Sequence, residues 1–191
     1  MLEKLPESLG RALHRHRAGF EKTVLQRLRA EKSIPSFEVR SDAFLDDQPM
    51  PARYTADGAG WSPALEWRGL PAATHGVALI VEDPDAPSPE PLVHAIVVDL
   101  QPEGSLAEGA LDSPDHKGAG LATGRNSYLR QSWLPPDPPR GHGPHHYVFQ
   151  VFALGAGPGF SRTPGRKEFF ERVQARVLAA GSITATYERV P

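Results

Sequence analysis

Apolar positions along the chain follow a helical spacing up to about residue 33 and a strand-like spacing beyond it. Side chains spaced three and four residues apart lie on the same face of a helix. The positions in this pattern are Leu2, Leu5, Leu9 and Leu13, then Phe20, Val24 and Leu28. The sequence therefore predicts an N-terminal helical arm over residues 1–33, with a break at Gly19.

After residue 34 the apolar residues gather in short β-branched and aromatic runs separated by Gly and Pro, which is typical of strands. The runs are SFEVR (36–40), VALIVE (77–82), HAIVVDL (94–100) and YVFQVFAL (147–154). The last run is apolar on both faces, as expected of a central strand. Residues 34–191 are predicted to form a mainly β domain, more consistent with a sandwich than with a parallel sheet.

Two elements are expected near the end of the chain. Residues 164–181 predict a helix, with Phe169, Val173 and Val177 on its apolar face and Gly181 as its stop. SITATYE (182–188) alternates like a last strand. Between Leu100 and His145, more than forty residues show little periodicity, and loops of that length are generally functional or disordered.

Composition and charge narrow the class of protein. The chain has 191 residues, no cysteine and a net charge of −2, so disulfides and thiolate sites are excluded. The arm is net basic and the rest mildly acidic, which argues against a nucleic-acid partner. No signal-like or membrane-spanning run is visible, so a soluble cytoplasmic protein is expected. The arm is expected to pack on the domain or on a second subunit; binding to an anionic membrane is the weaker alternative.

Several familiar motifs fail. GAGLATG (118–124) lacks both the preceding strand and the following Lys-Ser/Thr of a phosphate loop, and no G-x-S-x-G elbow is present. His142, His145 and His146 lie close in sequence, but their spacing matches no helical zinc motif. The sequence predicts no metal and no cofactor.

The remaining polar signals lie at strand ends. Asp83 and Asp85 stand in a turn that Pro84 and Pro87 restrict, and His94 opens an apolar strand. A Gly/Pro-rich loop leads into His145 and Tyr147. Taken singly, these residues also suit a rigid turn, a satisfied core histidine and packing. Taken together, an acid, two imidazoles and a phenol predict a polar pocket in which a carboxylate orients a histidine.

The same motifs resemble the phosphatidylethanolamine-binding protein family, which includes the Raf kinase inhibitor proteins. DPDAP (83–87), a histidine opening AIVVDL, and GPHHYVFQVFAL (143–154) occur in the family's order. The resemblance runs from about Phe37 to Glu188, takes in GWSPALEWRGLP (60–71) and SITATYE, and is closer to the bacterial branch.

The resemblance implies a fold and a site. The implied fold is an antiparallel β-sandwich of Greek-key type with flanking helices. It also implies a pocket for phosphate-bearing anions such as phosphoethanolamine, and cis prolines in the DPDAP turn. The implied ligand-binding residues are Asp83, Pro87, His94, Pro138, His145 and Tyr147, supported by Pro84 and Asp85.

Two departures from the family pattern concern charge. His146 stands where the family usually has arginine, so a salt bridge is expected to be lost. Asp137 stands where glycine is usual at the pocket rim, and its carboxylate is expected to weaken anion binding.

Three functions are compatible with these residues. The favoured one is a non-enzymatic binding or regulatory protein that binds a small anion more tightly at acid pH. The second is an inhibitor that docks its pocket rim and long loop onto a kinase or protease. The least favoured is a hydrolase with His145 or His94 as base and Ser88 or Ser127 as nucleophile. A homodimer is compatible with the arm.

Overall fold

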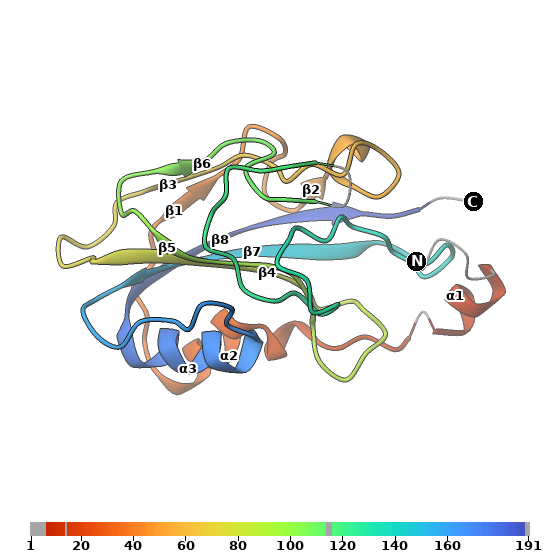
Figure 1. Cartoon of the computed structure of the whole chain (residues 1–191). Helices are drawn as coiled ribbons and strands as arrows, with labels where there is room; N and C mark the ends of the chain where they lie inside the picture. The colour runs from red at the N-terminus through yellow and green to blue at the C-terminus, as the bar shows by residue number, and fades with distance from the viewer. Residues whose placement is uncertain (1–6, 14, 114–115, 190–191) are drawn as a thin grey trace.

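The computed structural model describes residues 7–13, 15–113 and 116–189, and these form two stacked sheets with a helical layer below them (Figure 1). The residues before the long loop form α1 (Glu7–Leu13), η2 (Phe20–Lys22), α2 (Val24–Glu31), β1 (Glu38–Arg40), β2 (Gln48–Pro49), η3 (Ala52–Tyr54), β3 (Leu65–Arg68), β4 (Gly76–Asp83) and β5 (Leu92–Leu100). The rest form β6 (Ser105–Leu106), β7 (His145–Leu154), α3 (Arg166–Arg176) and β8 (Val177–Tyr187).

The larger sheet has the order β2-β8-β7-β4-β5, and the smaller one the order β1-β3-β6. The strands predicted from the apolar runs are all present, and β7 is central, between β8 and β4. The prediction of a mainly β sandwich is confirmed. It is wrong in one detail: the larger sheet is mixed, because the two-residue edge strand β2 pairs parallel with β8.

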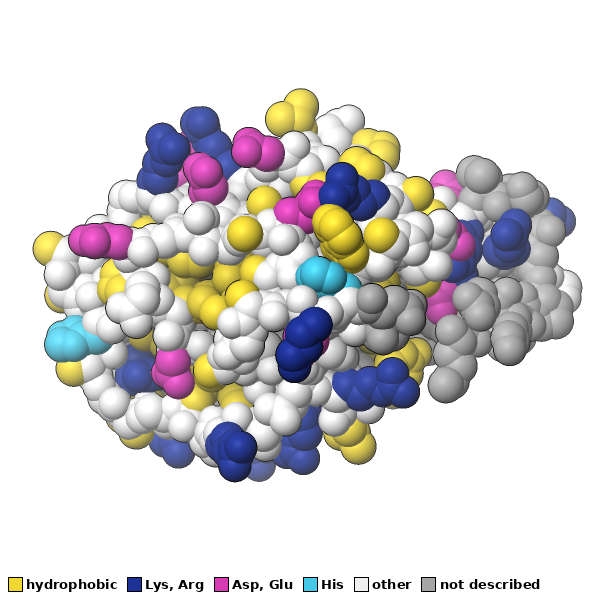
Figure 2. Space-filling view, turned by 45° about the horizontal axis from the view of Figure 1, so that its top comes forward, with side chains coloured by type: hydrophobic (Ala, Val, Ile, Leu, Met, Phe, Trp, Pro, Cys, Tyr) yellow, Lys and Arg dark blue, Asp and Glu magenta, His cyan; other side chains and the backbone are white. Residues whose placement is uncertain are grey.

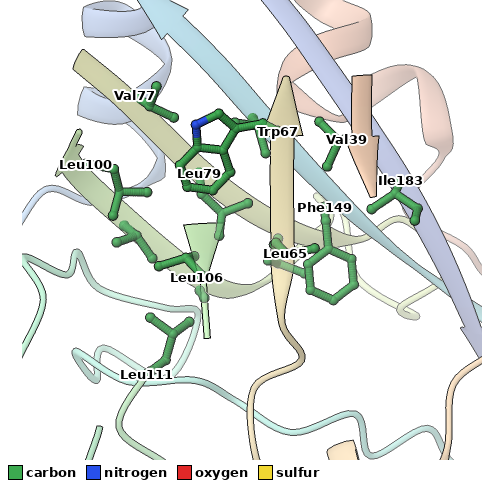
Figure 3. Close-up of a cluster of buried hydrophobic side chains, with 14 of the residues drawn as sticks. Val39, Leu65, Trp67, Val77, Leu79, Leu100, Leu106, Leu111, Phe149 and Ile183 are labelled. Atoms are coloured by element: carbon green, nitrogen blue, oxygen red, sulfur yellow. The ribbon is translucent and has the colours of Figure 1, made fainter. Parts of the chain in front are cut away.

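The two faces of the larger sheet bury different clusters, because successive side chains of a strand point to opposite faces. The inter-sheet cluster includes Leu79 of β4, Phe149 of β7 and Trp67 of β3 (Figure 3). On the opposite face, Ile80 and Phe152 pack with residues of α2 and α3. Burial on both faces explains why the central strands lack a polar face.

The predicted C-terminal helix is too long. The structure ends α3 at Arg176 and begins β8 at Val177, so Gly181 lies inside a strand. The run VLAA (177–180) has no polar position that would distinguish a helix from a buried strand. Packing decides: Gly181 pairs with Val151, and a Cβ at Gly181 would stand 2.5 Å from the carbonyl oxygen of Phe37.

The N-terminal arm is not one continuous helix. Gly19 has a φ of 110°, a left-handed conformation that favours glycine, so the predicted break there is confirmed. Beyond it, Val24, Leu25 and Leu28 of α2 are buried in the cluster shared with α3. Leu2 and Leu5 lie outside the described residues. The amide of Ala18 donates to the Ala86 carbonyl, so the arm also touches the DPDAP turn.

Two surface properties bear on function. Figure 2 shows basic and acidic side chains scattered over the displayed face rather than gathered by sign. Within the described part of the chain, no helix has the length and apolar character needed to cross a bilayer.

Candidate functional site

One cavity of about 750 Å³ lies where the long loop covers the ends of β4, β5 and β7. The six predicted ligand-binding residues all line it: Asp83, Pro87, His94, Pro138, His145 and Tyr147. Asp85 and Pro84, the two predicted supports, are buried in the same turn. The structure therefore brings the predicted residues together, and their role in binding stays a prediction.

The DPDAP turn is held by hydrogen bonds rather than by unusual peptide geometry. Asp83 Oδ1 accepts from the amide of Asp85 at 2.8 Å, which closes the bend locally. The amide of Gly19 donates to the Pro84 carbonyl from the arm. All peptide bonds of the described residues are trans, so the expected cis prolines are wrong.

A chain of three side chains runs from the turn into the cavity wall. Asp83 Oδ2 lies 2.7 Å from Nδ1 of His145, and both side chains are buried. His145 Nε2 lies 2.8 Å from Nδ1 of His142. His142 Nε2 in turn lies 3.0 Å from the carbonyl oxygen of Leu13 in the arm. Both nitrogens of His145 thus have partners within the protein.

His94 has one nitrogen without a partner. Its Nδ1 lies 2.6 Å from the carbonyl oxygen of Leu134, which can only accept, so Nδ1 carries the proton. Burial lowers the pKa of His94, outweighing the nearby charge of Asp83, and keeps the ring neutral. Its Nε2 is buried and has no hydrogen-bond partner among the described residues. The neutral ring therefore leaves one buried acceptor lone pair at the cavity.

The position of His94 comes from an irregularity in the sheet. Val81 pairs with Ala95, but the next residue, Glu82, pairs with Val93, so His94 is an extra residue on β5. Bulges of this kind re-aim side chains and occur often beside functional sites.

Two hydroxyl groups accompany His94. The ring of Tyr147 meets that of His94 edge to face, with centroids 5.0 Å apart. Burial and the charge of Asp83 raise the pKa of Tyr147 well above its usual value, so it stays a phenol. Within the part of the chain that the structure describes, the hydroxyl oxygens of Tyr147 and Ser113 are buried without partners, and both residues line the cavity. The wall thus holds an acceptor and two donors that the protein leaves unpaired.

The two departures in charge are compensated locally. Asp137 forms an ion pair with Arg189, which also binds Asp57, so its carboxylate does not face the cavity as an unbalanced charge. Asp85 forms an ion pair with Arg17 of the arm and lies 2.6 Å from Nδ1 of His146. Burial alone would raise the pKa of Asp85, but these hydrogen bonds outweigh it and lower the pKa.

Sequence reasoning missed several residues of this site. It weighed His142 only as a metal ligand, and among the described residues no group of three potential ligands is close enough to hold a metal ion. The repeated histidines of GHGPHH were the available signal for His142. Ser113, Arg17 and Arg189 gave none, because they lie far along the chain from the motifs they join.

The candidate nucleophiles are engaged elsewhere. Ser88 Oγ donates to the Glu90 carbonyl, and Ser127 Oγ accepts from the Val93 amide. Both line the cavity, but neither is hydrogen-bonded to a histidine within the described part of the chain. The geometry does not assemble a nucleophile and a base.

A β-rich sandwich with a cavity at its strand ends, whose wall includes Asp83, His94, His145 and Tyr147, defines a class of protein. Comparison with known proteins identifies that class. The sequence model of the phosphatidylethanolamine-binding protein family matches residues 40–188. The chain belongs to the phosphatidylethanolamine-binding protein family.

Relatives and solved structures agree with this assignment. A UPF0098 protein of Pyrococcus horikoshii is 34% identical over 154 residues, covering 78% of this chain and 75% of the relative. A UPF0098 protein of Mycobacterium tuberculosis is 39% identical over 151 residues, covering 78% and 69%. The crystal structure of E. coli YbcL matches with 27% sequence identity and a TM-score of 0.73, covering 81% of this chain and 99% of the YbcL chain. A phosphatidylethanolamine-binding protein homologue of Chlamydia trachomatis has 29% identity and a TM-score of 0.72, covering 81% and 98%.

Proposed function

We propose that this protein binds a small phosphate-type oxyanion in the cavity beside His94 and Tyr147, without chemical turnover. One observation carries the proposal: Nε2 of His94 and the hydroxyl of Tyr147 are both buried and unpaired in the wall of one cavity. Leaving a buried polar group unpaired costs about 1–3 kcal/mol. A ligand that satisfies both atoms recovers this cost on binding.

The protonation of the wall defines which oxyanion fits. Tyr147 can donate to a ligand oxygen, whereas neutral His94 can only accept. A singly protonated phosphate monoester offers both partners, an anionic oxygen for Tyr147 and a P–O–H for His94. A fully ionised phosphate would bind only after His94 takes up a proton. In both cases the complex holds one proton more than the dianion and the free protein, so affinity rises as pH falls.

Phosphoethanolamine is the proposed type of ligand, and the cavity wall suits its phosphate end better than its ammonium end. The phosphate end matches the unpaired atoms. The ammonium end would need a carboxylate, but Asp83 Oδ2 already pairs with His145 and Asp137 with Arg189. We therefore expect inorganic phosphate and phosphoethanolamine to bind with similar affinity.

The test is a titration of protein labelled with ¹⁵N in its histidine rings, at pH 6 and at pH 7.5. We expect Nε2 of His94 to shift strongly with inorganic phosphate, and about tenfold weaker binding for Tyr147→Phe. Tyr54→Phe is the matched control, because its hydroxyl bonds Glu108 outside the cavity. An unmoved His94 at millimolar phosphate and pH 6 would refute the proposal.

Inhibition of a kinase or protease partner is the second candidate. Its support is the rim of the cavity, where Tyr128 and Leu129 of the long loop are exposed, 43% and 75% respectively. Leu129 also has a φ of 62°, a backbone conformation that is uncommon for residues other than glycine. Loss of a partner captured from the native host on Leu129→Ser would support it. A homodimer, a cytoplasmic location and the absence of nucleic-acid partners stay predictions.

A further inference from the structure

The N-terminal segment reaches the cavity wall from outside the region that matches the family. Leu13 accepts from Nε2 of His142, and Arg17 pairs with Asp85. The guanidinium of Arg17 also lies 3.1 Å from the Pro144 carbonyl oxygen. Gly10 of α1 packs so closely on the Arg140 carbonyl that a Cβ would overlap it. The segment therefore contacts both the loop before β7 and the DPDAP turn.

These contacts fix where the protons of the histidine chain lie. The Leu13 carbonyl can only accept, so Nε2 of His142 must carry a proton. Burial, then the charge of His145, lowers the pKa of His142 and keeps its ring neutral. Its Nδ1 is then a bare acceptor, and His145 must donate to it through Nε2.

The next step sets a charge. With Nε2 of His145 protonated, its contact with Asp83 at 2.7 Å still needs a hydrogen between the two atoms. The pair is then either imidazolium with carboxylate or imidazole with carboxylic acid. Both arrangements have zero net charge.

Without the Leu13 carbonyl, and the His16 backbone that also hydrogen-bonds His142, the chain of protons can reverse. His142 could then hold its proton on Nδ1 and donate to Nε2 of His145. His145 would donate through Nδ1 to Asp83, and the pair would carry a net charge of −1. An oxyanion beside it would meet a repelling wall, because His94 and Tyr147 are neutral and Asp137 is already paired.

We propose that docking of the N-terminal segment completes the ligand site, by fixing the tautomer of His142 so that the Asp83–His145 pair is electrically neutral toward an oxyanion. Leu13 and Arg17 are thus positioning residues, and His142 connects them to the cavity. By linkage, a bound oxyanion should tighten the docking of the segment by the same factor. This inference rests on the proposed function only for its ligand; the tautomer is a property of the free protein.

The test compares Gly10→Val, which should displace α1 from the Arg140 carbonyl, with Ala12→Val on the exposed side of the same helix. Ring ¹⁵N shifts of His142 and His145 are recorded without ligand. We expect the His142 proton on Nε2 in the parent and in Ala12→Val, and on Nδ1 in Gly10→Val. An unchanged tautomer in Gly10→Val, or a proton on Nδ1 in the parent, would overturn the inference.

Phosphate titrations of the same proteins at pH 7 add the functional arm. We expect about tenfold weaker binding for Gly10→Val and an unchanged affinity for Ala12→Val. If no protein binds phosphate, the proposed function fails while the tautomer shifts still decide this inference. If Gly10→Val does not fold, Arg17→Ala replaces it in both the ¹⁵N and the phosphate measurements. Arg15→Ala is the exposed control for this variant. Arg17→Lys should restore part of the phosphate affinity that Arg17→Ala loses.

Discussion

Two carboxylates at the end of β4 are neighbours in sequence, and they differ in what surrounds them. Glu82 points to the helical side, where it accepts from the Val24 amide, Gln150 Nε2 and Arg166 Nε, at 2.6 to 2.8 Å. Asp83 points to the cavity, where the groups around it leave unpaired polar atoms. Both are buried.

The comparison separates a structural cluster from a site. In the Glu82 cluster, the carboxylate accepts from all three of these donors. It also caps α2, whose N-cap residue Thr23 makes no side-chain hydrogen bond to the helix. In the cavity cluster, Nε2 of His94 and the hydroxyl of Tyr147 have no hydrogen-bond partner among the described residues. Burial of charge alone therefore does not mark a binding site; under the proposed function, the unpaired polar atoms in the cavity wall do.

Removing Glu82 should give the largest loss of stability. Glu82→Ala leaves Arg166, Gln150 and the α2 amide without their acceptor, so the free energy of unfolding should fall by about 3–5 kcal/mol. Glu66→Ala, which removes an exposed pair with Arg68, should change it by less than about 1 kcal/mol. Urea unfolding measures both. A loss for Glu82→Ala no larger than that of the control would contradict the structural role.

Removing the unpaired hydroxyl of Tyr147 should not destabilise the protein. Tyr147→Phe deletes a buried group without a partner, so the free energy of unfolding should stay the same or rise by about 1 kcal/mol. Tyr54→Phe breaks a bond of 2.6 Å to Glu108 and should lower it by about 1 kcal/mol. A marked loss for Tyr147→Phe in thermal or urea unfolding would mean that the hydroxyl is structural.

Acid should destabilise the free protein more than the liganded one. The pKa of His94 is lowered by burial, so the unfolded chain takes up this proton first, near pH 6.5. The free energy of unfolding should therefore fall as pH drops below about 6.5, by at most about 1.4 kcal/mol per pH unit from this group. Bound phosphate should make this decrease in the free energy of unfolding smaller. The substitution His94→Asn should remove the part of the decrease that His94 causes. An equal slope in all three unfolding series would contradict the assignment.

The rim charge should have the smallest effect. Asp137→Asn leaves Arg189 with Asp57 alone and makes the rim slightly more positive. Phosphate affinity at low salt should rise about twofold, and the gain should shrink at high salt. A much larger gain would show that Asp137 repels anions despite its ion pair.

Prediction from sequence succeeded where local pattern and packing agree. Strand β7 and the turn after β4 were visible because apolar runs and prolines restrict the chain locally. The cis prolines were not predicted correctly. Nor was the end of α3, since the pairing of Gly181 and its close approach to Phe37 are long-range contacts. The bulge that aims His94 depends on strand register, which one sequence does not reveal.

The most direct test of the central claim is a crystal structure of the full chain grown with phosphate near pH 6. The proposal predicts one phosphate with its oxygens within hydrogen-bond distance of both Nε2 of His94 and the hydroxyl of Tyr147. A cavity that holds only water at saturating phosphate, or a phosphate bound elsewhere, would contradict it.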